Sequence, residues 1–431
     1  MGRTVTPELD AGVVERLYAY ALAFRPLFGR SDRYKQGRVY LHGLLLDGER
    51  KSIEPLSRRV PGGNEQNLQQ FINQSPWDPV PILAAYRARM AATFAREDGV
   101  IVIDDTGFPK QGKHSVGVAR QYSGTLGKRA NCQVATSLHY ASARGDYPLA
   151  LRLYLPEPWA SDPERLEQAR VPLDERAFKT KWQIALDLLD EVRAEGLRHA
   201  VVVADAGHGV ATELRDGLDR RGERYIVGVT GDAVVLTEPP SWVPHAPRRR
   251  RGRPATRAYL AEGGPRPVAI SSLAESLART TVCWRDGTKG KLEAEFAWVR
   301  VWPVHRWQMG VPADASPDAE ATTRWLLVEW RKDGTIQYAL SNLPPGTTVE
   351  RAVGFWKERW QVERGYEQLK GELGLDHFEG RSWPGFHHHA AMTFLAYGFL
   401  ALERRRARDA QSLDGPPDLE MPPPGEARRG A

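Results

Sequence analysis

Two short apolar runs that each end in an aspartate set the strongest limit on how this chain can fold. The first run covers residues 100–103 and ends at Asp104 and Asp105; the second covers 199–204 and ends at Asp205. Short runs rich in β-branched residues are typical of strands that are buried on both faces in an α/β sheet. Because α/β proteins usually build their sites at the carboxyl ends of such strands, the runs predict a sheet that delivers carboxylates to one edge.

The segments around these runs predict the order of the strands and helices. Thr106 and Gly107 are expected to turn the chain after the first run. Two strands, a helix, the second apolar run, another helix and a last strand follow, at 133–141, 147–155, 179–195, 199–204, 209–221 and 225–229. Three antiparallel strands followed by alternating helices and strands is the order of the ribonuclease H-like fold. We therefore expect an α/β catalytic domain that begins with residues 96–230.

The flanking segments differ in composition and predict further domains. Residues 1–95 have helical periodicity with basic residues near the turns, which predicts a DNA-binding domain, with a helical cap on the main domain as the alternative. Residues 231–333 are rich first in proline and then in tryptophan-containing strand patterns, which predict an inserted β-rich domain with a basic loop. Residues 334–402 return to the catalytic domain, and 403–431 have the composition of a disordered tail.

One helix in the last part of the catalytic domain has a face with unusual chemistry. Prolines and a glycine precede it, and Thr347 and Glu350 form a capping-box pair, so we expect a helix over 347–370. At about 100° per residue, one aromatic, two basic and one acidic side chain share a face: Trp356, Arg359, Glu363 and Lys370. This face fits contact with an anionic partner or, as the simpler alternative, a solvated surface with charge pairs.

Three acids of the expected catalytic domain, Asp104, Asp205 and Glu363, form the candidate catalytic set. Ligand sets made only of carboxylates suit hard cations such as Mg²⁺ or Mn²⁺, which bind phosphate oxygens. Two such ions about 3.5–4 Å apart can activate an attacking oxygen and stabilise a leaving oxygen in phosphodiester chemistry. Taken singly, each acid fits an ordinary turn or surface position, so the prediction of a two-metal site depends on their joint placement.

Composition is consistent with a polyanionic partner and argues against a membrane protein. The formal net charge is +6, and no apolar run approaches the roughly 18 residues of a transmembrane helix. Cys132 and Cys283 form neither a metal-ligand spacing nor a disulfide framework, and the first residues lack the apolar block of a signal peptide. We therefore expect a cytoplasmic, nucleoid-associated protein.

A basic run inside the proline-rich segment is a second candidate for DNA contact. It comprises Arg248, Arg249, Arg250, Arg251 and Arg253. Residues 251–254 form the core of an AT-hook, a short extended segment that places arginines in a narrow minor groove. The alternative is a basic, solvated loop without a groove preference.

Sequence blocks around the three acids resemble those of the DDE transposases of bacterial insertion sequences, most closely the insertion-sequence 701 group. The blocks lie at 104–134, 201–209 and 358–383, and the resemblance extends over 34–402. The related insertion-sequence 4 group has a Tyr, Arg, Glu, Lys signature whose gaps are matched here, with Trp356 in the place of the tyrosine. This substitution keeps an aromatic contact and removes the hydroxyl group.

The resemblance implies a ribonuclease H-like catalytic domain, a β-rich insertion between the second aspartate and the glutamate, and two divalent metal ions. It implies that Asp104, Asp205 and Glu363 bind the metals, and that Arg359 and Lys370 hold DNA phosphates beside the scissile bond. The implied activity is cut-and-paste transposition by a homodimer on DNA. In this reaction the phosphodiesters at the inverted-repeat ends of an element are hydrolysed, and the freed 3′ hydroxyls are joined to target DNA. The alternatives are a nuclease without strand transfer and a domesticated, non-catalytic DNA-binding protein.

Asp104 and Asp105 compete for the first catalytic position. Successive strand residues point to opposite faces, so only one of them can readily join Asp205 and Glu363. Periodicity leaves the choice open, because residues 100–103 are apolar on both faces. The family block implies that the acid directly after the apolar run is catalytic, and Asp105 is placed to cap the expected turn. We therefore assign the catalytic role to Asp104.

Overall fold

The computed structural model describes residues 12–240, 242–243, 257–260, 263–287, 290–304, 311–312 and 323–414. Within these residues the fold is a mixed α/β arrangement with one twelve-stranded sheet and one three-stranded sheet. The expected α/β class is therefore confirmed. The basic run Arg248, Arg249, Arg250, Arg251 and Arg253 lies outside the described residues.

Five strands at the centre of the large sheet include both apolar runs. They are β1 (Val100–Pro109), β3 (Lys128–Ser142), β4 (Gly145–Leu153), β5 (Val201–Ala204) and β6 (Tyr225–Val229). Their order is β4-β3-β1-β5-β6, in which β1, β5 and β6 are parallel and β3 is antiparallel to both β1 and β4. β2 (Ala119–Ser123) pairs antiparallel with the start of β3.

The register of β1 and β5 brings two carboxylates to the same edge of the sheet. Ile103 lies opposite Ala204 in this parallel pair, so the residues that follow, Asp104 and Asp205, are neighbours at the carboxyl ends of the two apolar runs. Residues 100–103 and 201–204 of these runs are buried, which explains why they lack the alternation of a strand with one solvated face.

Strands between residues 231 and 333 extend the central sheet beyond β6. β15 (Ile336–Ser341) pairs with β6. The sheet then continues through β14 (Arg324–Trp330), β12 (Gly290–Val304), β7 (Val234–Leu236) and β10 (Val268–Ala269), with β11 (Thr280–Gly287) beside β12. The small sheet contains β8 (Trp242–Val243), β9 (Arg257–Leu260) and β13 (Val311–Pro312). Most strands of this segment therefore belong to the central sheet, and its status as a separate domain stays a prediction.

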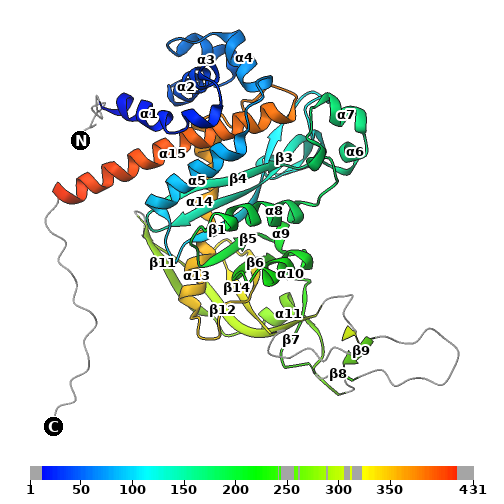
Figure 1. Cartoon of the computed structure of the whole chain (residues 1–431). Coiled ribbons are helices and arrows are strands. Elements are labelled where there is room, and N and C mark those ends of the chain that lie inside the picture. The colour runs from blue at the N-terminus through cyan, green and yellow to red at the C-terminus, as the bar shows by residue number, and fades with distance from the viewer. Residues whose placement is uncertain are drawn as a thin grey trace.

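Helices from the two ends of the chain lie together. Those before the first strand are α1 (Val13–Leu22), α2 (Ser31–Leu45), α3 (Ile53–Arg59), α4 (Glu65–Asn73) and α5 (Pro79–Phe94). They gather around the long α15 (Trp383–Asp414) at one end of the molecule, whereas β8 and β9 lie at the other end (Figure 1). The central part contributes α6 (Glu157–Ala160), α7 (Pro163–Gln168), α8 (Lys181–Ala194), α9 (Ala206–Gly209), α10 (Thr212–Arg220) and α11 (Ile270–Ala274).

The helix expected over 347–370 is broken into pieces, which corrects the prediction. α13 (Val349–Lys357) begins after Thr348, whose side chain accepts the N–H of Arg351, and α14 (Trp360–Glu367) is followed by a π-helical turn over Gln368–Glu372. The two helices pack on different neighbours, because α13 lies against β11 and α14 lies against β1 and β4. Tertiary packing therefore interrupts a segment that has continuous helical periodicity.

Two further boundaries differ from the sequence predictions. The turn expected at Thr106 and Gly107 is wrong, because β1 continues to Pro109. Gly107 instead allows β1 to lie close to Ser123, because a Cβ at this position would lie 2.7 Å from the Ser123 hydroxyl. The disordered tail expected from residue 403 is wrong over 403–414, where α15 continues to Asp414. Part of the tail, 415–431, lies outside the described residues.

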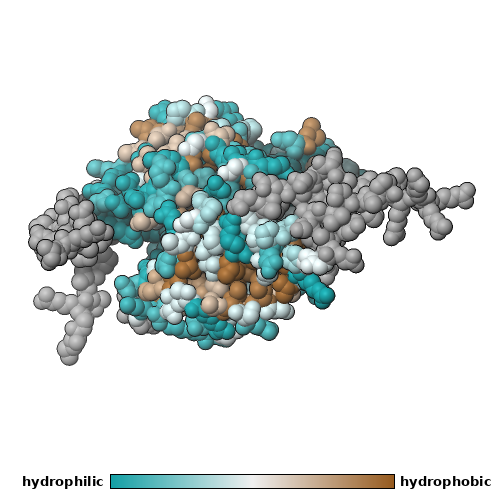
Figure 2. All heavy atoms as spheres, turned by 90° about the horizontal axis from the view of Figure 1, so that it is seen from below, coloured by the Kyte–Doolittle hydropathy of each residue, from teal (hydrophilic) through white to brown (hydrophobic). Residues whose placement is uncertain are grey.

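One apolar core extends through segments that the sequence divides into several domains. Its buried members include Tyr20 of α1, Ile101 of β1, Phe296 of β12 and Ala401 of α15. A smaller cluster lies around Val235, Ile270 and Leu326. Seen from below, the molecule shows a hydrophobic patch among hydrophilic residues (Figure 2). None of the described helices combines the length and the apolar composition that a membrane crossing requires.

Candidate active site

Asp104 and Asp205 form an acidic pair at the carboxyl edge of the sheet. Asp104 is half-buried, and its Oδ1 accepts the backbone N–H of Asp105 at 2.8 Å. Asp205 is the N-cap of α9, where its Oδ1 accepts the N–H of His208 at 3.3 Å. Burial and then the neighbouring charge of Asp205 raise the pKa of Asp104 to about 7. The pair therefore concentrates negative charge that a bound cation would relieve.

Asp105 is engaged by a different set of partners. Its Oδ2 lies 2.8 Å from Nζ of Lys181, and its Oδ1 lies 3.1 Å from Nε2 of His208. Thr136 donates a hydrogen bond to the same Oδ1 at 2.8 Å. Burial raises the pKa of Asp105, but His208 and Lys181 outweigh burial and hold it well below its usual value. The expected turn-capping role is therefore wrong: Asp105 ties β1 to α8 and α9 through ionic contacts.

Tyr366 anchors α14 against the strand that contains Asp104. Its buried hydroxyl hydrogen-bonds with Ser137 of β3, and the Ser137 hydroxyl donates to the backbone carbonyl of Asp104 at 3.2 Å. The Tyr366 ring packs edge-on against His139, with 4.9 Å between ring centres. These contacts fix α14 over the part of β1 that contains Asp104.

The helical segment that contains Tyr366 also contains Arg359, Glu363 and Lys370. The Arg359 charge acts on Asp104, where it opposes the larger effects that raise the Asp104 pKa. Lys370 is half-buried, and its Nζ donates a hydrogen bond to the carbonyl of Gly107 at 2.9 Å. Burial lowers the pKa of Lys370, and the negative charge of Asp104 opposes this effect. Glu363 is exposed and lies between these two cations along the segment. Its helix therefore passes the acidic pair, although its carboxylate faces solvent.

Trp356 has a supporting position. Its side chain is only 4% exposed, and its Nε1 donates to Oε2 of Glu329 at 3.0 Å. The guanidinium carbon of Arg359 lies 4.8 Å from the centre of the Trp356 ring. A buried ring does not offer the aromatic DNA contact expected from the sequence, and the geometry suits support of Arg359 instead.

Glu329 is a site-supporting residue that sequence reasoning missed. It is 1% exposed and accepts hydrogen bonds from Trp356, Lys357 and Arg331. The sequence does contain one indication of this role: Glu329 is the lone carboxylate in the apolar strand pattern 325–330. A carboxylate buried in such a strand requires cationic partners. Tyr366, His208 and Lys181 were also missed, and their roles depend on contacts between distant elements.

The acidic pair of Asp104 and Asp205 suits a hard divalent cation, but Glu363 does not join the pair in one ligand cluster. Two neighbouring carboxylates, one with a pKa raised to about 7, are the donor chemistry that such ions prefer. Among the described residues, however, no group of three or more His, Cys, Asp or Glu side chains is arranged to hold a metal ion. Asp104 and Asp205 could supply the first ligands, and Glu363 would have to join them from α14.

Comparisons with known proteins point to nucleic-acid chemistry. The sequence model of a family described as DDE superfamily endonuclease matches residues 23–291, a range that includes Asp104 and Asp205 and ends before Glu363. Over 383 residues the chain is 25% identical to a protein of Microchaete diplosiphon described as a probable transposase for insertion sequence element IS701. The match covers 88% of this chain and 86% of that protein.

Two solved structures have a weak overall likeness to this fold. A piggyBac transposase synaptic complex with hairpin DNA matches with a TM-score of 0.33 and 11% identity, over 95% of this chain and 69% of that one. The NurA nuclease from Sulfolobus solfataricus matches with a TM-score of 0.23 and 10% identity, over 77% of this chain and 88% of that one. At these scores neither likeness supports an argument about fold or function.

Proposed function

We infer that this chain, which belongs to the DDE superfamily of endonucleases, is a DNA transposase. The resemblance to the insertion-sequence 701 group is confirmed by the family match together with the Microchaete diplosiphon relative. DNA is accordingly its partner, and divalent metal ions belong to the chemistry of its family. Beyond this, we propose that the protein cuts phosphodiesters at the ends of an element and joins the freed 3′ hydroxyls to target DNA.

The acidic pair is the observation that best supports this reaction. Asp104 and Asp205 directly follow the paired residues Ile103 and Ala204 of two parallel neighbouring strands, and burial with mutual repulsion raises the pKa of Asp104 to about 7. We propose that Asp104, Asp205 and Glu363 hold two Mg²⁺ or Mn²⁺ ions. Bound ions of this kind polarise phosphate oxygens and stabilise the attacking and leaving oxygens of a displacement.

The surrounding residues position the strand and the carboxylates. Arg359 and Lys370 act electrostatically on Asp104, so a phosphate held by them would lie beside the acidic pair. The ionic contacts of Asp105 with Lys181 and His208 hold the end of β1 in place. Because its pKa lies near 7, the Asp104 carboxyl gains or loses a proton close to neutral pH. Binding of a cation by this carboxyl would therefore release the proton.

The order of the central strands supports a ribonuclease H-like catalytic fold, which we propose for this chain. Two antiparallel pairings, β4 with β3 and β3 with β1, are followed by the parallel strands β5 and β6. We further propose that the helices of residues 1–95 contact DNA and that two copies of the chain act together on the two ends of an element. Light scattering of the protein with and without end DNA would test the dimer.

The decisive test is strand transfer. A labelled duplex taken from the DNA that flanks the reading frame is incubated with the protein, Mg²⁺ and a supercoiled plasmid. A transposase gives both cleaved ends and labelled plasmid, because the freed 3′ hydroxyl attacks the target. Cleavage without labelled plasmid would support a nuclease, and binding without cleavage would support a non-catalytic DNA-binding protein.

A further inference from the structure

A basic groove opens beside α14, and neither Asp104 nor Asp205 lines it. It has a volume of about 540 Å³ and is formed by the turn between β3 and β4, by β11, α13 and α14, and by the last part of α15. Its arginines are Arg144, Arg285, Arg364, Arg404, Arg405 and Arg408. Lys357 adds a further cation.

The acids in this groove compensate only part of its positive charge. Asp146 and Glu358 are the carboxylates that line it, against seven cationic side chains among the described residues. Two of these cations have acidic partners outside the groove, because Lys357 is paired with Glu329 and Arg405 with Asp409. Asp146 accepts a hydrogen bond from Tyr397, and burial raises the pKa of both carboxyl groups. The groove therefore keeps a net positive charge, which favours a polyanionic ligand.

Stacking on tryptophan holds two of the arginines without using their N–H donors. The guanidinium carbons of Arg285 and Arg364 lie 4.8 Å and 5.0 Å from the centre of the Trp360 ring. Within the described part of the chain, neither guanidinium is paired with a carboxylate. A guanidinium fixed in this way presents its planar set of donors to a phosphate. The Trp360 ring already packs against cations, so the groove suits phosphates better than stacked bases.

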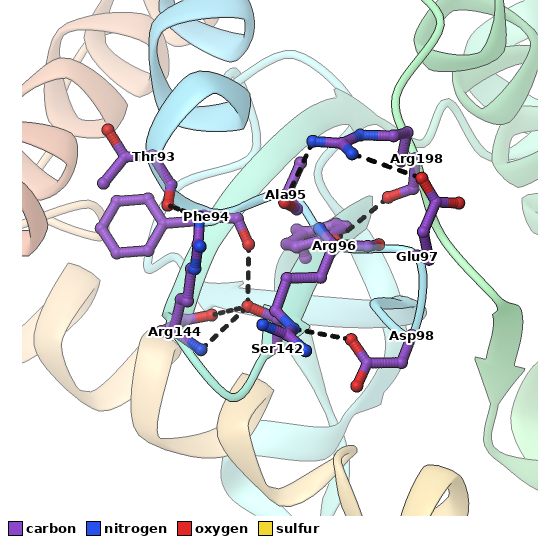
Figure 3. A network of polar contacts seen from close by, with 11 residues as sticks. Thr93, Phe94, Ala95, Arg96, Glu97, Asp98, Ser142, Arg144 and Arg198 are labelled. Carbon is purple, nitrogen blue, oxygen red and sulfur yellow. Dashed lines mark hydrogen bonds and ion pairs between the residues drawn. The ribbon is translucent and has the colours of Figure 1, made fainter.

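Arg144 is held at the groove wall by its local structure (Figure 3). Its backbone N–H donates to the hydroxyl of Ser142 at 3.2 Å, and its guanidinium Nη1 donates to the carbonyl of Thr93 at 3.3 Å. Ser142 in turn donates to the carbonyl of Phe94 at 2.9 Å. The turn between β3 and β4 is thereby tied to the end of α5, and Arg144 remains exposed.

The groove leads toward the candidate active site. A neighbouring hollow of about 350 Å³ is lined by Arg359 and Glu363. The two hollows share Trp284, Arg285, Lys357 and Trp360 along their common wall. A strand that passes through the groove would therefore continue past Glu363.

We propose that this groove binds the sugar–phosphate backbone of the DNA that flanks the scissile phosphate, without reading its sequence. This inference rests on the proposed function, because it places the substrate of the same reaction. Two consequences follow: each lost arginine should remove one phosphate contact, and the loss should be equal for any base sequence. None of these arginines was singled out by the sequence analysis.

The test compares two charge-matched double variants of the full-length protein. Arg144→Gln with Arg408→Gln removes two exposed groove arginines. Arg220→Gln with Arg224→Gln removes two exposed arginines near the end of α10 that do not line the groove. Binding of labelled duplex is measured by fluorescence anisotropy over a range of salt concentrations without divalent metal, on an element end and on an unrelated sequence.

We expect the groove variant to lower the slope of log K against log salt by about two, roughly one per arginine. The loss should be the same for both duplexes, and the control variant should keep the wild-type slope. Arg408→Glu, a change at an exposed helix position, serves as a second variant; it changes the charge by the same two units and should likewise lower the slope and weaken binding at a given salt concentration.

A wild-type slope in both groove variants would overturn the inference, as would a loss confined to the element end. Thermal melting confirms that each variant is folded. The proposed function is judged separately, by cleavage and strand transfer of the wild-type protein. An active wild type with unaffected groove variants rejects only the groove, whereas an inactive wild type rejects the proposed function.

Discussion

Two adjacent aspartates in the middle of β1 show how the environment assigns roles to identical side chains. Asp104 faces the repulsion of Asp205, and its pKa is raised to about 7 by burial and by that repulsion. Asp105 is satisfied by Lys181 and His208, which hold its pKa well below its usual value although burial acts in the opposite direction. A ligand for a cation needs unused negative charge, so Asp104 is the better candidate.

Replacing each of these aspartates by asparagine should separate catalysis from stability. Asp104→Asn should abolish Mg²⁺-dependent end cleavage, because an amide is a poor ligand for a hard cation. Asp105→Asn should retain substantial cleavage and lose about 2 kcal/mol of stability, because Lys181 and His208 lose their charged partner. The two variants are assayed side by side for cleavage and for thermal melting. A folded, inactive Asp105→Asn beside an active Asp104→Asn would reverse the assignment.

Glu363 can be tested against a neighbour on its own helix. Glu363→Gln should abolish cleavage and joining while leaving end binding largely intact, because the amide is nearly isosteric and ligates metal poorly. Glu367→Gln is the matched control, since Glu367 is also exposed and lies one turn further along α14. Binding is measured by mobility shift and cleavage on a labelled end with Mg²⁺. Full cleavage by Glu363→Gln would remove this residue from the site.

At the scale of single residues, the sequence predicted those members of the candidate site that local pattern can reveal. Asp104 and Asp205 follow from the apolar runs that they terminate, because a buried strand delivers its next residue to the sheet edge. Tyr366 could not be found in this way, and the lone carboxylate of Glu329 in an apolar strand pattern indicates a need for cationic partners without identifying them. Their partners, Trp356 and Ser137, are far away in the chain, so their roles exist only after folding.

At the scale of elements, periodicity located most strands and helices but not their ends. β6 spans the predicted residues, whereas β1 runs past the predicted turn. The helix over 347–370 was predicted as one piece because its pattern is continuous, and it breaks because α13 and α14 pack on different strands. Such breaks depend on tertiary contacts that periodicity does not contain.

The start of β5, the strand that leads to Asp205, is held by a charged contact that should be visible in the pH dependence of stability. His199 lies 2.8 Å from Oε2 of Glu223 through Nε2 and 3.0 Å from the carbonyl of Leu197 through Nδ1. Both neighbours are acceptors, so both ring nitrogens can donate at once only when the imidazole is protonated. Burial lowers the pKa of His199, but Glu223 and the Leu197 carbonyl outweigh burial and raise it above its usual value.

A histidine whose pKa is higher in the folded state than in the unfolded state stabilises the folded protein. This stabilisation is complete below the unfolded-state pKa of about 6.5, and it is lost as the pH rises through the folded-state pKa. The free energy of unfolding of the wild type should therefore fall from about pH 6.5 upward. His199→Gln should flatten this dependence, whereas the exposed His114→Gln should preserve it. Urea denaturation across this pH range gives the measurement. Parallel curves for wild type and His199→Gln would show that the histidine is uncharged in the folded protein.

At the scale of the whole molecule, the chain is more continuous than the sequence predicts. Composition divides it into a helical segment, a catalytic segment and a β-rich insertion. The structure shows most strands of 231–333 pairing into the central sheet, and the main core contains Tyr20, Ile101 and Phe296. A second, smaller cluster lies around Val235 and Leu326. Strand pairing between distant segments leaves no mark in local composition, so this continuity could not be predicted.

A continuous core and sheet predict a single cooperative thermal transition for the full chain. In calorimetry the van't Hoff and calorimetric enthalpies should agree, as they do for two-state unfolding. Phe296→Ala in β12 removes a fully buried side chain of the main core and should lower the midpoint of the entire transition through a loss of about 3–5 kcal/mol. Leu292→Ala is the matched control, because Leu292 lies on the same strand and is exposed. Two resolved transitions, with only one of them shifted by Phe296→Ala, would show that residues 231–333 form an independent domain after all.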